Sequence, residues 1–232
     1  MNQVKNIYSY LFNNYGPQGW WPILDYKGVN PTKTGSIHGY HPGDYSFPRS
    51  KDEQFEIIIG SVLTQNTAWP NVEKALRSLK KLKAINPKRI LALNDEALKE
   101  AIRPAGYFNQ KAIYLKEMSK FYISLNRRTP TRKELLKVKG VGNETADSIL
   151  LYAYKQPEFV VDAYTKRIFS NLGLISEKAR YEEIKKLLED NLPKEVVIFQ
   201  EYHALIVEHA KRNYSKKPYD DPLYILCCVT LS

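Results

Sequence analysis

The sequence predicts an all-α protein, and three observations support this fold class. Apolar residues recur at helical spacing through most of the 232 residues. No two alternating apolar runs are joined by a two-residue turn, which is the pattern of paired strands. The chain is also longer than most single domains, so it can bury one large core or two smaller ones. We therefore expect packed helices arranged in one or two units.

Several of the expected helices have recognisable starts or faces. Proline stands near the first turn in INPKRILAL and TPTRKELL, and Asp162 opens the helix of VVDAYTKRIF. The segment Ile57–Leu63 gives an apolar face to the helix that contains it. In chain order, the expected helices cover 3–13, 53–65, 69–82, 87–93, 95–102, 107–124, 131–137, 142–154, 162–171, 179–190 and 193–212.

The charge of the chain indicates a polyanionic partner. Lys and Arg number 35 against 25 Asp and Glu, and the formal net charge of +10 is spread along the sequence. A nucleic acid fits this pattern best, and an anionic membrane surface comes second. No run approaches the ~20 apolar residues of a membrane span, and the N-terminus lacks a signal-peptide core. We expect a cytoplasmic protein, associated with the nucleoid in a prokaryote and not with a membrane.

One long segment, Gly16–Asp52, does not fit a helix. It holds six of the eleven glycines and five of the thirteen prolines. A loop of this length in a compact domain is usually functional or disordered. Its residues His38, His41 and Asp44 invite a metal site, but the ligand set is incomplete, so no metal is expected. Together with Arg49 they suit a packed loop or a flap that faces nucleic acid.

A glycine hairpin follows in LLKVKGVGNETADSILLYA. One helix ends at Gly140 and the next begins around Gly142, with Val141 between them and Lys139 before them. So narrow a turn points successive backbone N–H groups outward, where they can hold a phosphate oxygen directly or through a monovalent cation. The alternative is an ordinary helix connection with glycine at the C-cap.

Asp162 comes next, at the start of a helix and directly after three apolar residues. It can be a helix N-cap, which stabilises by about 1 kcal/mol. It can also be a fixed carboxylate beside a core, which suits charge stabilisation in a site.

The motifs GSVLTQNTAW, GVGNETAD and VVDAYTKRIF, in this order and spacing, resemble the helix-hairpin-helix DNA glycosylases of the endonuclease III superfamily. The resemblance covers roughly Phe55 to Arg212. It implies that a damaged base is flipped from duplex DNA and that Asp162 supports cleavage of its glycosidic bond. Two helical lobes with a cleft between them are also implied, and we expect a monomer. One lobe would be 50–156, including the helix-hairpin-helix at 131–154, and the other 1–49 plus 157–232.

The position of the family's strand-cleaving lysine is occupied by Glu144. A carboxylate cannot form a Schiff base, so the resemblance implies a monofunctional enzyme. Strand cleavage stays open as an alternative, because Lys139 and Lys166 lie nearby in the sequence. The family's iron–sulfur loop needs four cysteines near the C-terminus, where this chain has only Cys227 and Cys228. The pair is adjacent, which gives no disulfide framework and indicates a reducing compartment, so neither an iron–sulfur cluster nor another cofactor is expected.

The base pocket and the wedge are also implied by the resemblance. Gln65 and Asn66 would follow a helix end, where Gln65 fills the gap left by the flipped base; a solvated helix C-terminus is the alternative. Trp20, Trp21 and Trp69 are the three tryptophans of the chain. They resemble the aromatics that sandwich the base in the 3-methyladenine DNA glycosylase III branch. Two stand in a Gly/Pro-rich segment, which favours exposed or half-exposed recognition residues over core residues.

A cationic alkylated purine, such as 3-methyladenine, would gain cation–π attraction from these indoles. Two rival functions remain. A glycosylase for mismatched, deaminated or oxidised bases would be favoured by hydrogen-bonding groups in the pocket. A non-catalytic DNA-binding module would be favoured if Asp162 turned into solvent. In IRPAGYFNQKA, Tyr107 and Lys111 suit contacts to the DNA backbone or opposite strand, although an ordinary polar loop explains them equally well.

Overall fold

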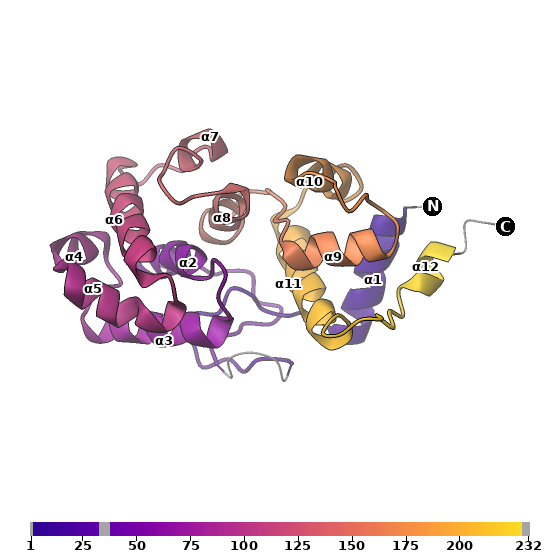
Figure 1. Cartoon of the computed structure of the whole chain (residues 1–232), viewed down its shortest axis with the longest axis horizontal. Helices are drawn as coiled ribbons and strands as arrows, with labels where there is room; N and C mark the ends of the chain where they lie inside the picture. Colours follow the sequence, from indigo (N-terminus) through magenta and orange to yellow (C-terminus); the bar gives the residue numbers. More distant parts are fainter. Residues whose placement is uncertain (1, 33–37, 229–232) are drawn as a thin grey trace.

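The computed structural model describes residues 2–32 and 38–228 and is built of helices (Figure 1). Within these residues no strand forms, and Val29 and His38 make one isolated bridge. The all-α prediction is therefore confirmed. The helices are α1 Gln3–Tyr15, α2 Lys51–Leu63, α3 Trp69–Lys81, α4 Pro87–Ala92, α5 Asp95–Ile102, η1 Arg103–Ala105, α6 Phe108–Ser124, α7 Arg132–Leu135, α8 Asn143–Ser148, η2 Ile149–Ala153, α9 Ala163–Asn171, α10 Tyr181–Asp190, α11 Val196–Asn213 and α12 Tyr224–Cys228.

The helices fall into two groups, to which we give fixed names (Figure 1). The central group contains α2 to α8 with η1 and η2. The terminal group contains α9 to α12 and also α1, which packs against α11 and α12 although it lies at the opposite end of the sequence. The division into two lobes at residues 50–156 stays a prediction.

Local sequence explains where the central helices begin and end. Ser50 and Glu53 form a reciprocal capping box, so α2 starts slightly earlier than the sequence predicted. The helix expected at 142–154 is shorter than a continuous α-helix, because α8 passes into the π-helical turn η2. The short helix α12 was not predicted.

The segment between α1 and α2 is held by buried carboxylates. The Leu24 N–H donates to Glu56 of α2 at 2.8 Å, and the Gln18 N–H donates to Glu201 of α11 at 2.8 Å. Burial raises the pKa of Glu56 to about 7. Because its anchors lie on both groups of helices, this glycine-rich segment joins the two groups, and its residues therefore do not belong to the terminal group alone.

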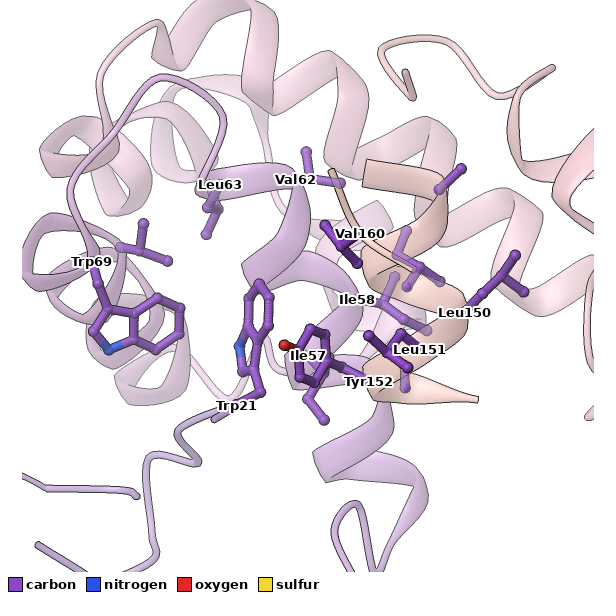
Figure 2. Packing of buried hydrophobic residues seen from close by; sticks show 14 of the residues in the cluster. Trp21, Ile57, Ile58, Val62, Leu63, Trp69, Leu150, Leu151, Tyr152 and Val160 are labelled. Atoms are coloured by element: carbon purple, nitrogen blue, oxygen red, sulfur yellow. The ribbon is translucent and has the colours of Figure 1, made fainter. Parts of the chain in front are cut away.

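The core runs from α2 into the π-helical turn η2 (Figure 2). Its labelled members include Ile57, Ile58, Val62 and Leu63 from α2 and Leu150, Leu151 and Tyr152 from η2. Trp21 and Trp69 lie at its edge, so apolar packing continues up to the side chains that were expected to read a base.

Lys111 is a buried centre of polar contacts, contrary to the expectation that it contacts DNA. Its ammonium donates to the carbonyl oxygens of Leu63, Gln65 and Ala105, each at 2.8 Å. Lys111 is only 2% exposed, whereas Tyr107 four residues earlier is 68% exposed. The amphipathic lysine thus ties the end of α2 to the start of α6, because helix-end carbonyls lack partners of their own.

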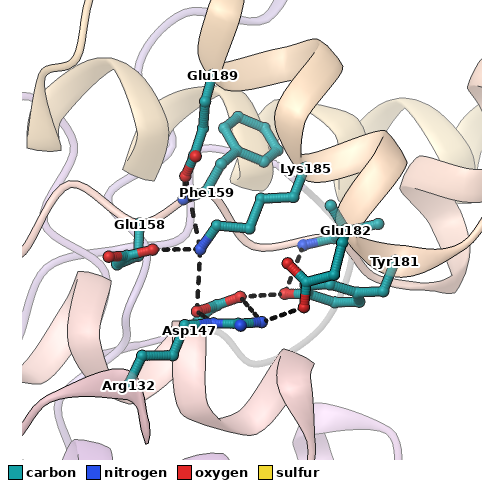
Figure 3. Close-up of polar contacts among 9 residues, drawn as sticks. Arg132, Asp147, Glu158, Phe159, Tyr181, Glu182, Lys185 and Glu189 are labelled. Carbon is teal, nitrogen blue, oxygen red and sulfur yellow. Dashed lines mark hydrogen bonds and ion pairs between the residues drawn. The ribbon is translucent and has the colours of Figure 1, made fainter.

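A second polar centre joins the two groups (Figure 3). The carboxylate of Asp147 in α8 is fully buried and receives Arg132 Nε at 2.7 Å and the Tyr181 hydroxyl at 2.7 Å. Lys185 of α10 lies 3.1 Å from it and also pairs with Glu158. One buried anion therefore connects the hairpin helices to α10.

We expect Asp147→Asn to lower the free energy of unfolding by about 3–5 kcal/mol, because two partly buried cations lose their shared anion. For a chain of this size the melting temperature should fall by about 2–4 °C per kcal/mol. Thermal and denaturant unfolding measure both quantities.

The matched control is Asp190→Asn. Asp190 pairs with Lys186 of the same helix α10 at 2.7 Å, but both side chains are exposed. Its loss should cost less than about 1 kcal/mol. Equal losses for the two variants would contradict a special role for the buried anion.

Candidate active site

A cleft of about 1110 Å³ lies between the central and terminal groups. Its lining comes from the segment after α1, from both ends of the loop between α2 and α3, from the hairpin, and from α9 and α11. Nine of the predicted site residues share it: Trp20, Trp21, Gln65, Asn66, Trp69, Gly140, Gly142, Glu144 and Asp162. Lys139 and Val141 are not among its lining residues; Val141 is 9% exposed and packs in the core.

Asp162 caps α9 and faces the cleft with the same carboxylate. Its Oδ1 accepts from the Thr165 N–H at 2.7 Å and from the Thr165 hydroxyl at 2.8 Å. The side chain is 12% exposed, and Oδ2 lies 3.7 Å from His203 Nε2. Asp162 is thus both an N-cap and a cleft residue, and it does not turn into bulk solvent.

The charge of Asp162 is supported against its burial. Burial opposes ionisation, but His203 and the two Thr165 donors outweigh it and hold the pKa of Asp162 below its usual range. An aspartate in this state is an anion at neutral pH. Such a fixed negative charge can stabilise a cation that develops in the cleft.

Glu144, the neighbouring carboxylate, has the opposite tendency. Its side chain reaches solvent in the cleft, but the surrounding walls and then the charge of Asp162 raise the pKa of Glu144 to about 7. Two carboxylates that share a cleft resist ionising together. Near neutral pH, Glu144 is therefore the one that takes up a proton, and Asp162 remains charged.

The two hairpin glycines have different structural reasons. Gly140 has φ +86°, and a Cβ there would lie 2.2 Å from the ring of Tyr114, so a side chain is excluded twice. Gly142 is the N-cap of α8, and a Cβ there would meet no atom within 4 Å. The open side of the hairpin is thus at Gly142, where the first N–H groups of a helix lack partners of their own.

Gln65 is anchored in this structure. Its Nε2 donates to the Gly140 carbonyl at 2.8 Å and lies 3.0 Å from the Thr145 hydroxyl. Asn66, by contrast, is exposed and has φ 53°, at the turn that follows α2. The free form therefore ties Gln65 to the hairpin and presents Asn66 outward.

The three tryptophans pack on one another at the cleft. Trp69 lies edge to face with Trp20 at 4.9 Å and with Trp21 at 5.4 Å between ring centroids. Gly60 in α2 makes room for this cluster, since a Cβ there would lie 3.2 Å from Trp21 Nε1. Trp21 and Trp69 are only 4% and 7% exposed. The expectation of exposed or half-exposed residues is wrong for these two, because each indole covers the next.

Their polar atoms have no protein partners. Within the part of the chain that the structure describes, the three indole Nε1 atoms are buried and make no hydrogen bond. A buried donor without an acceptor costs about 1–3 kcal/mol. A ligand that opens the cluster and supplies acceptors would recover part of this cost.

The sequence pointed to no residue on the wall formed by α11. His203, Val207 and Lys211 recur at every fourth position and line the cleft together with Glu208. Burial lowers the pKa of Lys211. The available signal was the spacing itself: polar side chains on one stripe of an otherwise apolar helix indicate a lined cavity.

The remaining polar candidates do not form a metal site. Both ring nitrogens of His41 face carbonyl oxygens, Asp44 O at 2.7 Å and Trp21 O at 2.9 Å, so neither is free to bind a metal. Among residues 2–32 and 38–228 no group of three or more His, Cys, Asp or Glu is arranged to hold a metal ion. The iron–sulfur prediction concerns Cys227 and Cys228, whose side chains are outside the described residues.

Membrane insertion finds no support in the helices. Within the same described residues, none combines the length and the apolar character that crossing a bilayer requires.

Comparison with known proteins identifies the family. Residues 59–194 match the model of the HhH-GPD superfamily of base excision DNA repair proteins. MJ1434 of Methanocaldococcus jannaschii, named as a candidate DNA repair glycosylase, is 43% identical over 225 residues, which cover 92% of this chain and 90% of that protein.

Two solved structures are similar as well. The 3-methyladenine DNA glycosylase MagIII of H. pylori, bound to 1,N6-ethenoadenine, matches with a TM-score of 0.67 and 28% identity over 90% of this chain and 95% of its own. A trapped covalent complex of endonuclease III with DNA matches with a TM-score of 0.67 and 26% identity over 75% and 83%. With its helix-hairpin-helix and cleft aspartate in place, this chain is a DNA N-glycosylase of the HhH-GPD superfamily.

Proposed function

We propose that the chain is a monofunctional DNA glycosylase that hydrolyses the glycosidic bond of a damaged base at Asp162. The observation that carries the proposal is the convergence of Asp162, the hairpin glycines and three indoles on one cleft. The base would leave with the electron pair of the C1′–N bond, and water would add to C1′. A proton from that water would finally reach the departing base.

Asp162 suits this reaction because the sugar becomes positively charged as the bond breaks. Its low pKa supplies the anion, and the Thr165 contacts fix its position. These properties support a catalytic role in addition to the N-cap role.

Duplex DNA is the proposed partner. The helix hairpin presents Gly142 on an open side, where a phosphate oxygen can approach the backbone without meeting a side chain. A monovalent cation could bridge this contact. The net charge of +10 adds attraction that does not depend on sequence.

Base removal without strand cleavage is supported by the amines near the cleft. Glu144 offers none, and Lys166 Nζ donates to the Ala179 carbonyl at 3.0 Å. Among the described residues, the one lysine that lines the cleft is Lys211. The sequence-based alternatives Lys139 and Lys166 are thus less well placed than Lys211 to form a Schiff base.

Two classes of base remain as substrates. Alkylated purines are supported by the likeness to MagIII and by the indoles, which favour a cationic base through their ring faces. Bases with carbonyl oxygens, such as uracil, thymine opposite guanine or 8-oxoguanine, are favoured by a specific observation: three buried indole donors have no acceptor. The edge-to-face packing also offers donor edges, whereas a stacked cation needs parallel faces. The second class is therefore the one that the geometry favours.

We expect Asp162→Asn to reduce single-turnover excision about a thousandfold while binding to lesion-containing duplex stays equal or tightens. Asparagine is also a good N-cap, so the unfolding free energy should change little. Asp162→Ala is the control that loses both the cap and the charge. Unchanged excision by Asp162→Asn would remove Asp162 from the mechanism.

We expect borohydride to trap no covalent complex with lesion-containing DNA, since Glu144 has no amine. An endonuclease III that carries the family lysine serves as the positive control. If an adduct does form, its loss in Lys211→Gln, with Lys139→Gln and Lys166→Gln unaffected, would show lyase chemistry at Lys211.

We expect wild-type protein to excise a carbonyl-bearing base faster than 3-methyladenine when duplexes with each lesion are compared. Trp69→Phe keeps an aromatic face but removes the N–H. It should slow excision of the carbonyl-bearing base about ten- to hundredfold and change excision of a cationic purine much less. Preferential excision of 3-methyladenine that survives Trp69→Phe would instead support the alkylated-purine class.

A further inference from the structure

We infer that His203 is the positioning residue for the Asp162 carboxylate and that Tyr152 controls the proton on its ring. The inference rests on the proposed role of Asp162 and adds two residues to the site. Neither was suggested by the sequence motifs, because they come from η2 and α11, far from α9 in the chain.

The three side chains form a continuous line from the core to the cleft. The Tyr152 hydroxyl lies 2.7 Å from His203 Nδ1 and 3.2 Å from the Gln200 carbonyl. On the other side of the ring, His203 Nε2 lies 3.7 Å from Asp162 Oδ2. Tyr152 and His203 are 2% and 7% exposed, so little solvent competes for these contacts.

The donors in this line restrict where the ring protons lie. The Gln200 carbonyl can only accept, and Tyr152 has one hydrogen to give. If Tyr152 donates to Nδ1, the ring is neutral and carries its hydrogen on Nε2. If Tyr152 donates to Gln200, Nδ1 must donate to the tyrosine oxygen, and a charged ring again carries a hydrogen on Nε2.

Both arrangements direct an N–H toward Asp162. The remaining neutral tautomer would place the Nε2 lone pair against the carboxylate and is disfavoured by repulsion. Tyr152 therefore lets His203 gain or lose a proton while the same donor keeps facing Oδ2.

The division of labour on the carboxylate is then complete. Thr165 holds Oδ1 with two donors, and His203 faces Oδ2 from the opposite wall of the cleft. Oδ2 keeps no hydrogen bond of its own at 3.7 Å, so it stays available to the reacting sugar or water. Without His203, burial would favour the neutral acid, which cannot stabilise a developing cation.

Other titratable and charged groups surround this pair and must be separated from it. They are Glu144 of α8, Tyr164 and Arg167 of α9, Tyr181 of α10, and Glu208 and Lys211 of α11, all on the cleft, with Glu201 acting on Tyr152 from α11. Glu144 matters most, because its pKa of about 7 falls within the range of an activity profile.

The first experiment measures the single-turnover excision rate against pH for wild type and His203→Phe, each also in a Glu144→Gln background. Activity requires ionised Asp162, so it is present above the pKa of that residue and lost as the pH falls through it. Loss of His203 should raise this pKa and move the acid limb upward by about one pH unit or more. The rate should therefore fall at least about tenfold near pH 6 and much less near pH 8.

The matched control is His209→Phe. His209 lies on the same helix and pairs with buried Asp221 at 2.9 Å, outside the lining of the cleft. It should lose stability without moving the acid limb. Tyr152→Phe removes only a hydroxyl and should shift the limb by less than His203→Phe does, which keeps the test decisive if the histidine variant folds poorly.

A second experiment needs no substrate. Carbon-13 NMR follows the Asp162 carboxyl through a pH titration, with its signal assigned by Asp162→Asn. A higher pKa in His203→Phe or Tyr152→Phe supports the inference. An unchanged carboxyl pKa, or excision rates that fall by the same factor at every pH, would overturn it. A shifted carboxyl pKa combined with full excision by Asp162→Asn would instead overturn the proposed function and leave the contact intact.

Discussion

The buried carboxylate of Asp147 is the contact on which the geometry of the site depends. It receives a guanidinium from α7, a hydroxyl and an ammonium from α10, and it belongs itself to the helix that follows the hairpin. The chain between α8 and α9 passes beside this network on its way to Asp162 (Figure 3). The distance between the hairpin and the catalytic wall is therefore set by charge pairing in a dry environment, where geometry is enforced more strictly than at a surface.

Within that frame, Asp162 shows how one residue can serve two needs. A helix N-terminus supplies donors to one carboxylate oxygen, and the opposite wall supplies an N–H toward the other. The first contact begins a helix, and both together keep a charge in a place that burial alone would neutralise. Glu144, a few ångströms into solvent and without such donors, has the opposite response to the same cleft.

Much of this molecule could be predicted from local patterns, and the rest depended on contacts between distant segments. Helical periodicity located the helices, and the motif order located the hairpin and Asp162. The burial of Lys111 could not be foreseen, because its acceptors belong to Leu63, Gln65 and Ala105 in other segments. His203 likewise acquires its meaning only when α11 packs beside α9. Trp21 misled because Gly/Pro-rich sequence suggests exposure, whereas Gly60 leaves a space that an indole fills.

The anchoring of Gln65 has a consequence for how such a protein would travel along DNA. In the free form its amide holds the Gly140 carbonyl and approaches Thr145, so the side chain is sheathed against the very turn that would grip a phosphate. To enter a duplex it must give up these bonds, and the hairpin must then find other partners. Gripping the backbone and probing the base stack are thus thermodynamically linked, and undamaged DNA, which offers no vacancy to fill, would leave the probe at rest.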